Sequence, residues 1–178
     1  MKFAANLGFL FVKEATSLAD RYSHARAAGF TAVEVAFPYE VPVETLAAAK
    51  SASGLQQILL NAYPGDLSKG EIGLAIYPDR REEFRESLEV SLKYCKALDC
   101  KKLHIMAGKV GPTGDLVEHE DVYVENLRYA AGRLEKEGVL ALIEPCNNQW
   151  IPGYFMNHPQ KALKVRVCIL LRVRFAEL

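Results

Sequence analysis

The sequence lacks several features that would place it in a common class. No apolar run approaches the ~20 residues that a membrane-spanning helix needs. Lys plus Arg and Asp plus Glu both number 22, so the chain has no net charge to attract nucleic acid or acidic membranes. Neither a GxGxxG motif after the first expected strand nor a GxxxxGK[ST] motif occurs. We therefore expect no nucleic-acid partner, no membrane partner and no nucleotide cofactor.

The chain also lacks paired cysteines and a clear targeting signal. No CxxC pair occurs, and the spacing suits neither a disulfide framework nor a zinc site. The apolar first twelve residues have only Lys2 as a basic region and no A-x-A-like cleavage site before Lys13, which favours a first strand over a signal peptide. We expect reduced thiols and a cytoplasmic protein. The four cysteines are Cys95, Cys100, Cys146 and Cys168.

What is present is an alternation of short apolar runs with longer amphipathic ones. Gly29, Gly54 and Gly138 mark helix ends, and Asp79 is expected to cap the third helix. Strands that alternate with helices imply βαβ units and a parallel sheet. Five such units do not close an eight-stranded barrel, which takes ~250 residues, so the fold is an open α/β sheet or a barrel that stops early. Strands are expected over residues 3–7, 32–37, 55–61, 102–106 and 139–144, and helices over 15–28, 42–53, 80–98, 121–136 and from 158 onward.

Glu144 is the strongest candidate for chemistry. Five apolar residues precede it and Pro145 follows it, so its carboxylate is expected at the mouth of a buried strand. In parallel α/β folds the carboxyl ends of the strands hold the active site. A half-buried carboxylate there can bind a divalent metal through oxygen, or act as an acid/base if burial raises its pKa. The alternative is a glutamate ion-paired at the rim.

Other polar residues interrupt the apolar strands. His104 is expected on the same strand face as Met106, where it is either a substrate contact or a hydrogen-bonded core histidine. Three further residues could each cap a neighbouring loop, but their recurrence on several strands favours a polar barrel interior that faces a substrate. These residues are Asn6, Glu34 and Asn61.

The glycine-rich stretch from Pro64 to Gly73 follows the third strand. Such a loop can close over a ligand and exclude water, and the alternative is a long surface connection. Arg80 and Arg81 come soon after it and could pair with an anionic substrate, although solvated arginines are more common in a first helical turn.

Seven stretches in order carry a family signal: FAANLGFLF (3–11), AGFTAVEVAFPY (28–39), NAYPGDLSKGEIGLA (61–75), LHIMAG (103–108), ENLRYAA (125–131), LIEPCN (142–147) and GYF with HPQKAL downstream (153–163). Any one of them alone would be a weak signal, and together they are specific. They resemble the hydroxypyruvate isomerases within the xylose-isomerase-like (β/α)8 group. The resemblance implies an α/β fold of the (β/α)8 TIM-barrel type, with only about the first five βα units present.

The resemblance implies a reversible, aldose–ketose-type conversion of hydroxypyruvate and 2-hydroxy-3-oxopropanoate (tartronate semialdehyde) through an enediolate. A base must take a proton from the carbon that bears the hydroxyl, and a donor must stabilise charge on the carbonyl oxygen. In this family a glutamate at the end of the fifth strand transfers the proton and helps to hold a metal, and Glu144 occupies that position. The implied cofactor is a divalent metal, Mg²⁺ or Mn²⁺. The residues implied to bind the small hydroxy-oxo acid are His104, Asn61 and Asn6.

The match has departures. Gly8-Phe9 stands where the family usually has Ser-Trp, and Cys146 stands where it usually has Ile. Family members continue for about another hundred residues, which supply strands six to eight, a second catalytic glutamate and further metal ligands. We therefore interpret residues 1–164 as the N-terminal part of such a barrel and residues 165–178 as an atypical tail.

The tail alternates apolar and basic residues between positions 165 and 175, a pattern that fits a sixth strand, although so short a window fits a helix equally well. An unclosed parallel sheet leaves an unpaired edge, so we expect self-association. The predicted function is the isomerase reaction given above. The alternatives are a catalytically incomplete isoform that acts as a binding or assembly partner or has no function, and a different small-molecule enzyme built on Glu144.

Overall fold

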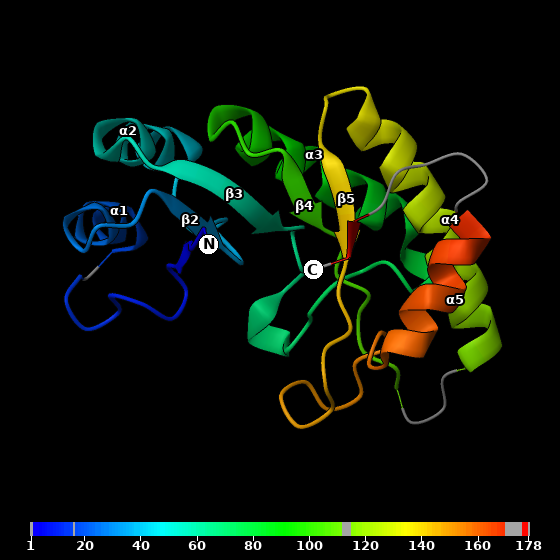
Figure 1. The fold of residues 1–178 in the computed structure, drawn as a ribbon. Coiled ribbons are helices and arrows are strands. Elements are labelled where there is room, and N and C mark those ends of the chain that lie inside the picture. Colours follow the sequence, from blue (N-terminus) through cyan, green and yellow to red (C-terminus); the bar gives the residue numbers. More distant parts are fainter. Residues whose placement is uncertain (1, 16, 112–114, 170–175, 178) are drawn as a thin grey trace.

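The computed structural model describes residues 2–15, 17–111, 115–169 and 176–177. Its strands are all parallel and form one sheet in chain order, from β1 to β6 (Figure 1). The five predicted βα units are confirmed as the first part of a (β/α)8 TIM-barrel type of fold. The strands are β1 (Ala5–Asn6), β2 (Ala32–Val35), β3 (Gln56–Asn61), β4 (Lys102–His104), β5 (Leu140–Ile143) and β6 (Ala176–Glu177).

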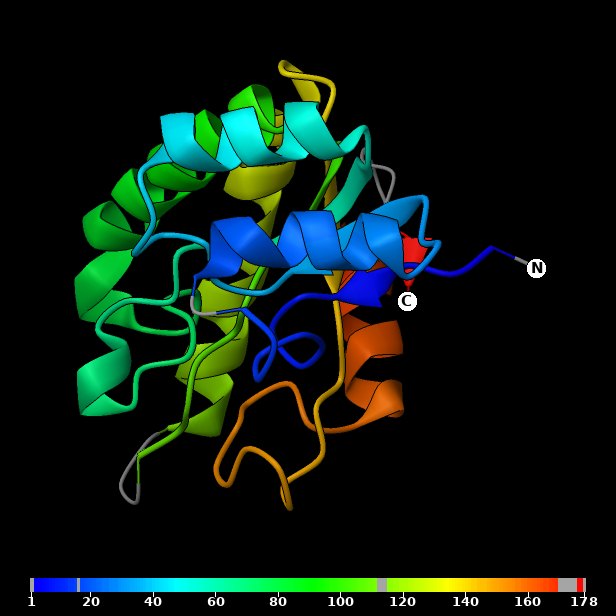
Figure 2. The ribbon, with the colours of Figure 1, turned by 90° about the vertical axis from the view of Figure 1, so that its left-hand side faces the viewer.

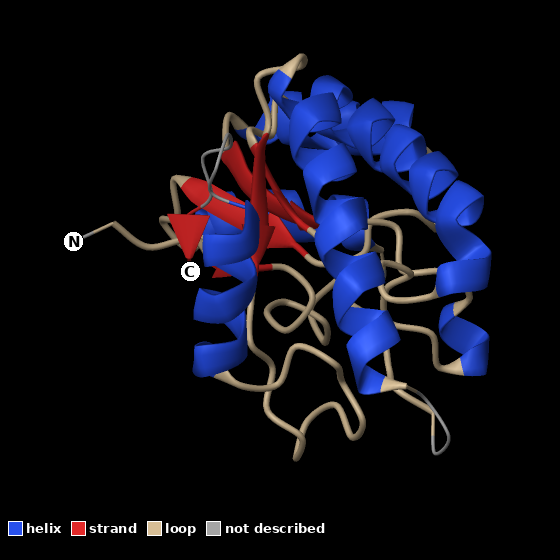
Figure 3. Ribbon diagram, turned by 90° about the vertical axis from the view of Figure 1, so that its right-hand side faces the viewer, coloured by secondary structure: helices blue, strands red, loops and turns tan. Residues whose placement is uncertain are grey.

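Helices form an outer layer around the curved sheet, and neighbouring helices pack against each other in chain order (Figures 1 and 2). The loops that follow the strands gather at one end of the molecule (Figure 3). None of the described helices is long and apolar enough to cross a membrane. The helices are α1 (Leu18–Ala27), α2 (Val43–Ser53), α3 (Arg81–Ala97), α4 (Leu116–Glu135) and α5 (Pro159–Ile169), with the 3-10 helices η1 (Leu67–Lys69) and η2 (Pro78–Arg80) between β3 and α3.

The core lies between the sheet and these helices. On α3, Phe84, Leu88 and Leu92 recur every four residues, so one face of the helix is buried against the sheet. Burying a Leu or Phe side chain stabilises the fold by about 1.5–3 kcal/mol. This apolar stripe holds α3 behind β4 and leaves the ends of the strands free for polar side chains.

Two predicted helix starts are wrong. Asp79 does not cap α3: it lies in η2, and Arg80 precedes α3 without a side-chain cap. The helix expected from residue 121 begins at Leu116, because the Asp115 carboxylate accepts hydrogen bonds from the amides of Val117 and Glu118. The strands are also shorter than predicted, since their apolar ends continue into the loops.

The described part of the atypical tail contains both a helical segment and a short strand. Residues 165–169 continue helix α5, so of the two alternatives the helix is confirmed there and the strand is wrong. Residues 170–175 lie outside the described residues. Ala176 and Glu177 form β6, which pairs in parallel with Leu142 and Ile143 of β5. Helix α5 therefore spans the boundary proposed at residue 164, and that boundary stays a prediction.

Candidate functional site

A cavity of about 470 Å³ brings together the five polar strand residues that the sequence singled out. Each lies at or near the carboxyl end of its strand. Asn6 of β1 is in register with Glu34 of β2, and Asn61 of β3 is in register with His104 of β4. Glu144 follows directly after β5. Parallel pairing thus places side chains from five segments of the chain around one cavity.

Apolar side chains complete the wall. Phe9, Ile72 and Ile151 come from the loops after β1, β3 and β5, and Met106 and Cys146 lie close to the ends of β4 and β5. Ile72 and Ile151 were not predicted as site residues from the sequence, whereas the family resemblance places the departures at Gly8-Phe9 and Cys146 near the pocket.

Glu144 is a half-exposed carboxylate whose acidity is weakened by its surroundings. Its side chain is 47% exposed. Burial raises its pKa, and the nearby negative charge of Glu34 raises it further. A carboxylate with a raised pKa is a stronger base, so the environment suits proton transfer. Among the described residues no Lys or Arg forms an ion pair with Glu144.

His104 is 1% exposed, and neither of its ring nitrogens has a hydrogen-bond partner among the described residues. Burial lowers the pKa of its imidazole to about 4, so the ring is neutral at pH 7. Its Nδ1 lies 3.6 Å from Glu144 Oε2, too far for a hydrogen bond, and a neutral ring makes no ion pair. Buried polar atoms without partners are rare and often mark a ligand site. The alternative of a hydrogen-bonded core histidine is not what the structure shows.

Asn6 both caps a turn and lines the cavity. The Gly8 amide donates to Asn6 Oδ1 at 2.9 Å, which turns the amide NH₂ of Asn6 towards Glu34. Asn6 Nδ2 then donates to Glu34 Oε1 at 2.7 Å. The two alternatives for Asn6, loop capping and a pocket position, therefore hold together.

Asn61 presents its amide beside Met106. Its Nδ2 lies 3.6 Å from Met106 Sδ, and the Tyr39 hydroxyl donates to its backbone carbonyl at 2.5 Å. These contacts hold the end of β3 in place, where Asn61 lines the cavity.

The glycine-rich segment after β3 is anchored at several points. Asp66 caps η1 through Ser68, and Glu71 accepts from the Asp66 amide at 2.7 Å and pairs with Arg80 at 2.6 Å. Arg81 pairs with Glu125 on α4 at 3.2 Å. Both arginines are therefore engaged by glutamates, and neither lines the cavity.

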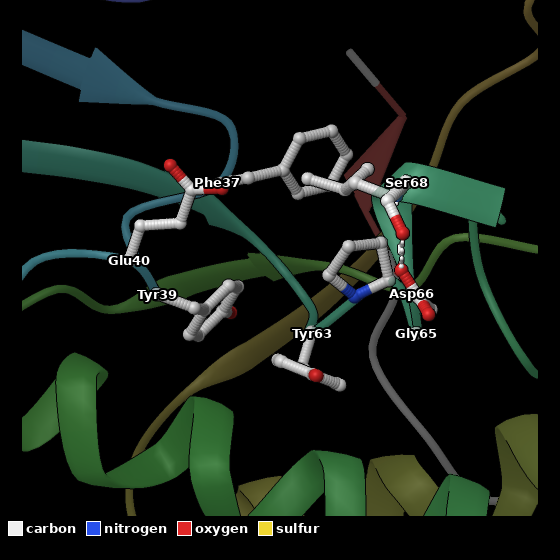
Figure 4. A pocket seen from close by; sticks show the side chains of 9 residues that line it. Phe37, Tyr39, Glu40, Tyr63, Gly65, Asp66 and Ser68 are labelled. Atoms are coloured by element: carbon white, nitrogen blue, oxygen red, sulfur yellow. Dashed lines mark hydrogen bonds between the residues drawn. The ribbon is translucent and has the colours of Figure 1, made fainter. Parts of the chain in front are cut away.

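The same segment walls a second cavity of about 360 Å³ (Figure 4). Tyr39 and Glu40 lie on one side of it, and Asp66 and Ser68 lie on the other. Phe37 lines both cavities, so the two are neighbours.

The described residues do not by themselves form a metal site. No group of three His, Cys, Asp or Glu side chains among them could hold a metal ion. The Glu144 carboxylate and the neutral His104 lie 3.6 Å apart, and this pair is one ligand short of such a group.

Comparisons with known proteins agree with this architecture. A hydroxypyruvate isomerase of Escherichia coli (strain K12) is 41% identical over 166 residues, covering 93% of this chain and 63% of that protein. A 2-oxo-tetronate isomerase of Cupriavidus necator is 42% identical over 156 residues, covering 88% of this chain and 59% of that protein. A solved structure described as AP endonuclease, family 2, from Brucella melitensis is 37% identical with a TM-score of 0.92, covering 99% of this chain and 67% of that chain.

This chain thus spans about three fifths of the length of these two isomerases. The family model described as "Xylose isomerase-like TIM barrel" matches residues 22–166, which is most of the chain. The chain belongs to the xylose isomerase-like TIM barrel family.

Proposed function

We propose that this chain acts in the reversible isomerisation of hydroxypyruvate and 2-hydroxy-3-oxopropanoate, with Glu144 as the catalytic acid/base. The observation that carries the proposal is the meeting of a carboxylate of raised pKa with an unpartnered, neutral imidazole in one cavity. The relatives named as isomerases of short hydroxy-oxo acids support it.

In the proposed reaction Glu144 takes a proton from C3 of hydroxypyruvate, the carbon that bears the hydroxyl. The electron pair of the C–H bond forms the C2–C3 double bond of an enediolate, and the carbonyl oxygen becomes negatively charged. The C3 hydroxyl proton then passes to the negatively charged C2 oxygen, the electron pair of that O–H bond forms the C3 carbonyl, and Glu144 returns its proton to C2, which gives 2-hydroxy-3-oxopropanoate. No electrons enter or leave, so an acid/base and an oxyanion donor are sufficient.

His104 is the proposed donor to the oxygen that gains charge. A neutral imidazole donates one N–H hydrogen bond, and with a pKa of about 4 it stays neutral through the physiological range. The apolar wall around it strengthens that hydrogen bond by excluding water. The Asn61 amide is proposed to hold a substrate hydroxyl beside it, and Asn6 to contact substrate from β1.

A divalent metal, Mg²⁺ or Mn²⁺, stays a proposal based on the family resemblance. Glu144 would be one oxygen ligand, and none of the steps above depends on the metal. The proposed cytoplasmic location rests on cysteine usage, since the described cysteines Cys95, Cys100 and Cys146 are free thiols.

The Brucella melitensis relative raises nucleic acid as another ligand class, but the charge of this chain does not favour it. The net charge is zero, and the described residues that line the cavity of about 470 Å³ include two glutamates and no Lys or Arg. Proteins that bind nucleic acid neutralise phosphates with clustered Lys and Arg side chains. A small-molecule substrate therefore fits this cavity better.

Turnover of hydroxypyruvate by the purified chain, with and without Mg²⁺ or Mn²⁺, tests the proposal. Glu144→Gln should abolish the reaction, and Glu135→Gln, an exposed carboxylate at the end of α4, should leave it unchanged. Turnover lost only in Glu144→Gln supports the proposal. Absence of turnover in the unmodified chain would instead favour the catalytically incomplete isoform.

A further inference from the structure

The charge of the cavity wall is unusual for a site that takes an acid. Glu34 and Glu144 both line the cavity, His104 is neutral, and no Lys or Arg is among the lining residues that the structure describes. A hydroxy-oxo acid brings a carboxylate of its own. That carboxylate is repelled by the negative charge of this wall.

Glu34 is held towards the cavity by strand alternation and by a hydrogen bond. Its neighbours Val33 and Val35 are buried in the core, so the Glu34 side chain lies on the opposite face of β2. Asn6 fixes one oxygen of the Glu34 carboxylate through the 2.7 Å hydrogen bond, and Gly8 fixes Asn6. Among the described residues no Lys or Arg forms an ion pair with Glu34.

Glu34 and Glu144 line the same cavity although β2 and β5 are three strands apart in the sheet. A ligand between these two strands therefore lies between two carboxylates. Hydroxyl and carbonyl groups suit this region, because Glu34 accepts from a hydroxyl and His104 donates to a carbonyl.

We propose that Glu34 determines how the substrate is oriented and whether a charged or an uncharged ligand is preferred. The uncharged hydroxy-carbonyl end of the ligand lies against Asn6 of β1 and Glu34 of β2, and a substrate carboxylate points away from them. The inference rests on the proposed function for its choice of substrate. It goes further in assigning Glu34 as a specificity-determining residue. It also predicts that uncharged hydroxy-ketones bind this chain at least as well as hydroxy-oxo acids do.

The test compares dissociation constants for dihydroxyacetone, which is uncharged, and hydroxypyruvate, measured by NMR titration of the full chain in EDTA. The unmodified chain should bind dihydroxyacetone as tightly as hydroxypyruvate or more tightly. Glu34→Gln keeps an acceptor for Asn6 and should tighten hydroxypyruvate binding by about tenfold, with little change for dihydroxyacetone. Glu44→Gln makes the same charge change on the exposed face of α2 and should change neither constant.

Unmodified protein provides a second readout that needs no variant. Raising the salt concentration screens Glu34 and should tighten hydroxypyruvate binding while leaving dihydroxyacetone binding constant. A ratio of the two constants that is unaffected by Glu34→Gln, or tighter binding of hydroxypyruvate by the unmodified chain, would overturn the inference. Either result leaves the turnover assay with Glu144→Gln untouched, so the failure of this inference is distinguishable from the failure of the proposed function.

Discussion

Glu144 and His104 lie 3.6 Å apart, and the same low-dielectric surroundings push their pKa values in opposite directions. Burial disfavours the charged form of each, so it raises the pKa of the carboxyl and lowers that of the imidazole to about 4. For each group the protonation equilibrium therefore shifts towards the neutral form. The result is a pair in which the carboxylate can exchange a proton while the imidazole only donates a hydrogen bond.

The lowered pKa of His104 makes the stability of the protein sensitive to acid. In the unfolded chain the imidazole takes up a proton near pH 6.5, whereas in the folded protein it does so near pH 4. The free energy of unfolding should therefore fall as the pH drops from 6.5 to 4, by about 3 kcal/mol in total, and be unaffected by this group above that window. Urea unfolding at pH 7 and pH 5 measures the change.

The same histidine can be followed directly. The ring-proton NMR signal of His104 should titrate with a midpoint near pH 4. In His104→Gln the fall in stability between pH 7 and pH 5 should be smaller by about 2 kcal/mol. A midpoint near 6.5 would show that the imidazole is solvated or bonded, and would contradict its proposed role.

At the scale of the elements, the loop between β3 and α3 positions part of the cavity by close backbone packing. Gly73 has φ +100° and forms a β-bridge with Ala107. A Cβ on Gly73 would lie 2.3 Å from the Met106 carbonyl oxygen, so only glycine fits there. The contact places Ile72, the residue before it, on the cavity wall beside Met106.

Gly73→Ala should therefore destabilise the fold by about 3 kcal/mol or more, through backbone strain together with the clash. Gly29→Ala is the matched control, because Gly29 also has a positive φ of +88° but a Cβ there would have no atom within 4 Å. That variant should lose only about 1–2 kcal/mol. Equal losses in chemical denaturation would show that the loop does not pack closely against Met106.

The elements also show what the sequence could and could not predict. Alternation of apolar runs with amphipathic ones was enough to order the strands and to place Asn6, Asn61 and Glu144 at one end of the sheet. The helix starts were less predictable, because Asp79 and Asp115 are both plausible caps and only the fold decides which aspartate meets free amides. The register shift between β2 and β3, in which Ile58 of β3 is the extra residue, depends on pairing between strands, which local sequence does not encode.

For the whole molecule, the described strands form an open sheet in which β1 and β6 each have a single neighbour. Unpaired backbone groups at such edges favour pairing with another chain. Phe3, beside β1, is 68% exposed and adds apolar surface at that edge. We therefore predict self-association. Sedimentation velocity should show an average mass that rises with protein concentration, and a monomer at every concentration would contradict the prediction.

Proton transfer by Glu144 is the central claim, and exchange of the C3 protons of hydroxypyruvate with D₂O tests it most directly. The exchange needs only the first half of the reaction, so it is visible even where full turnover is slow. The chain should catalyse loss of the C3 proton signal, and Glu144→Gln should slow that loss by at least about 10²-fold, while Glu135→Gln should not. Catalysed exchange at an equal rate in Glu144→Gln would contradict the assignment of Glu144 as the acid/base.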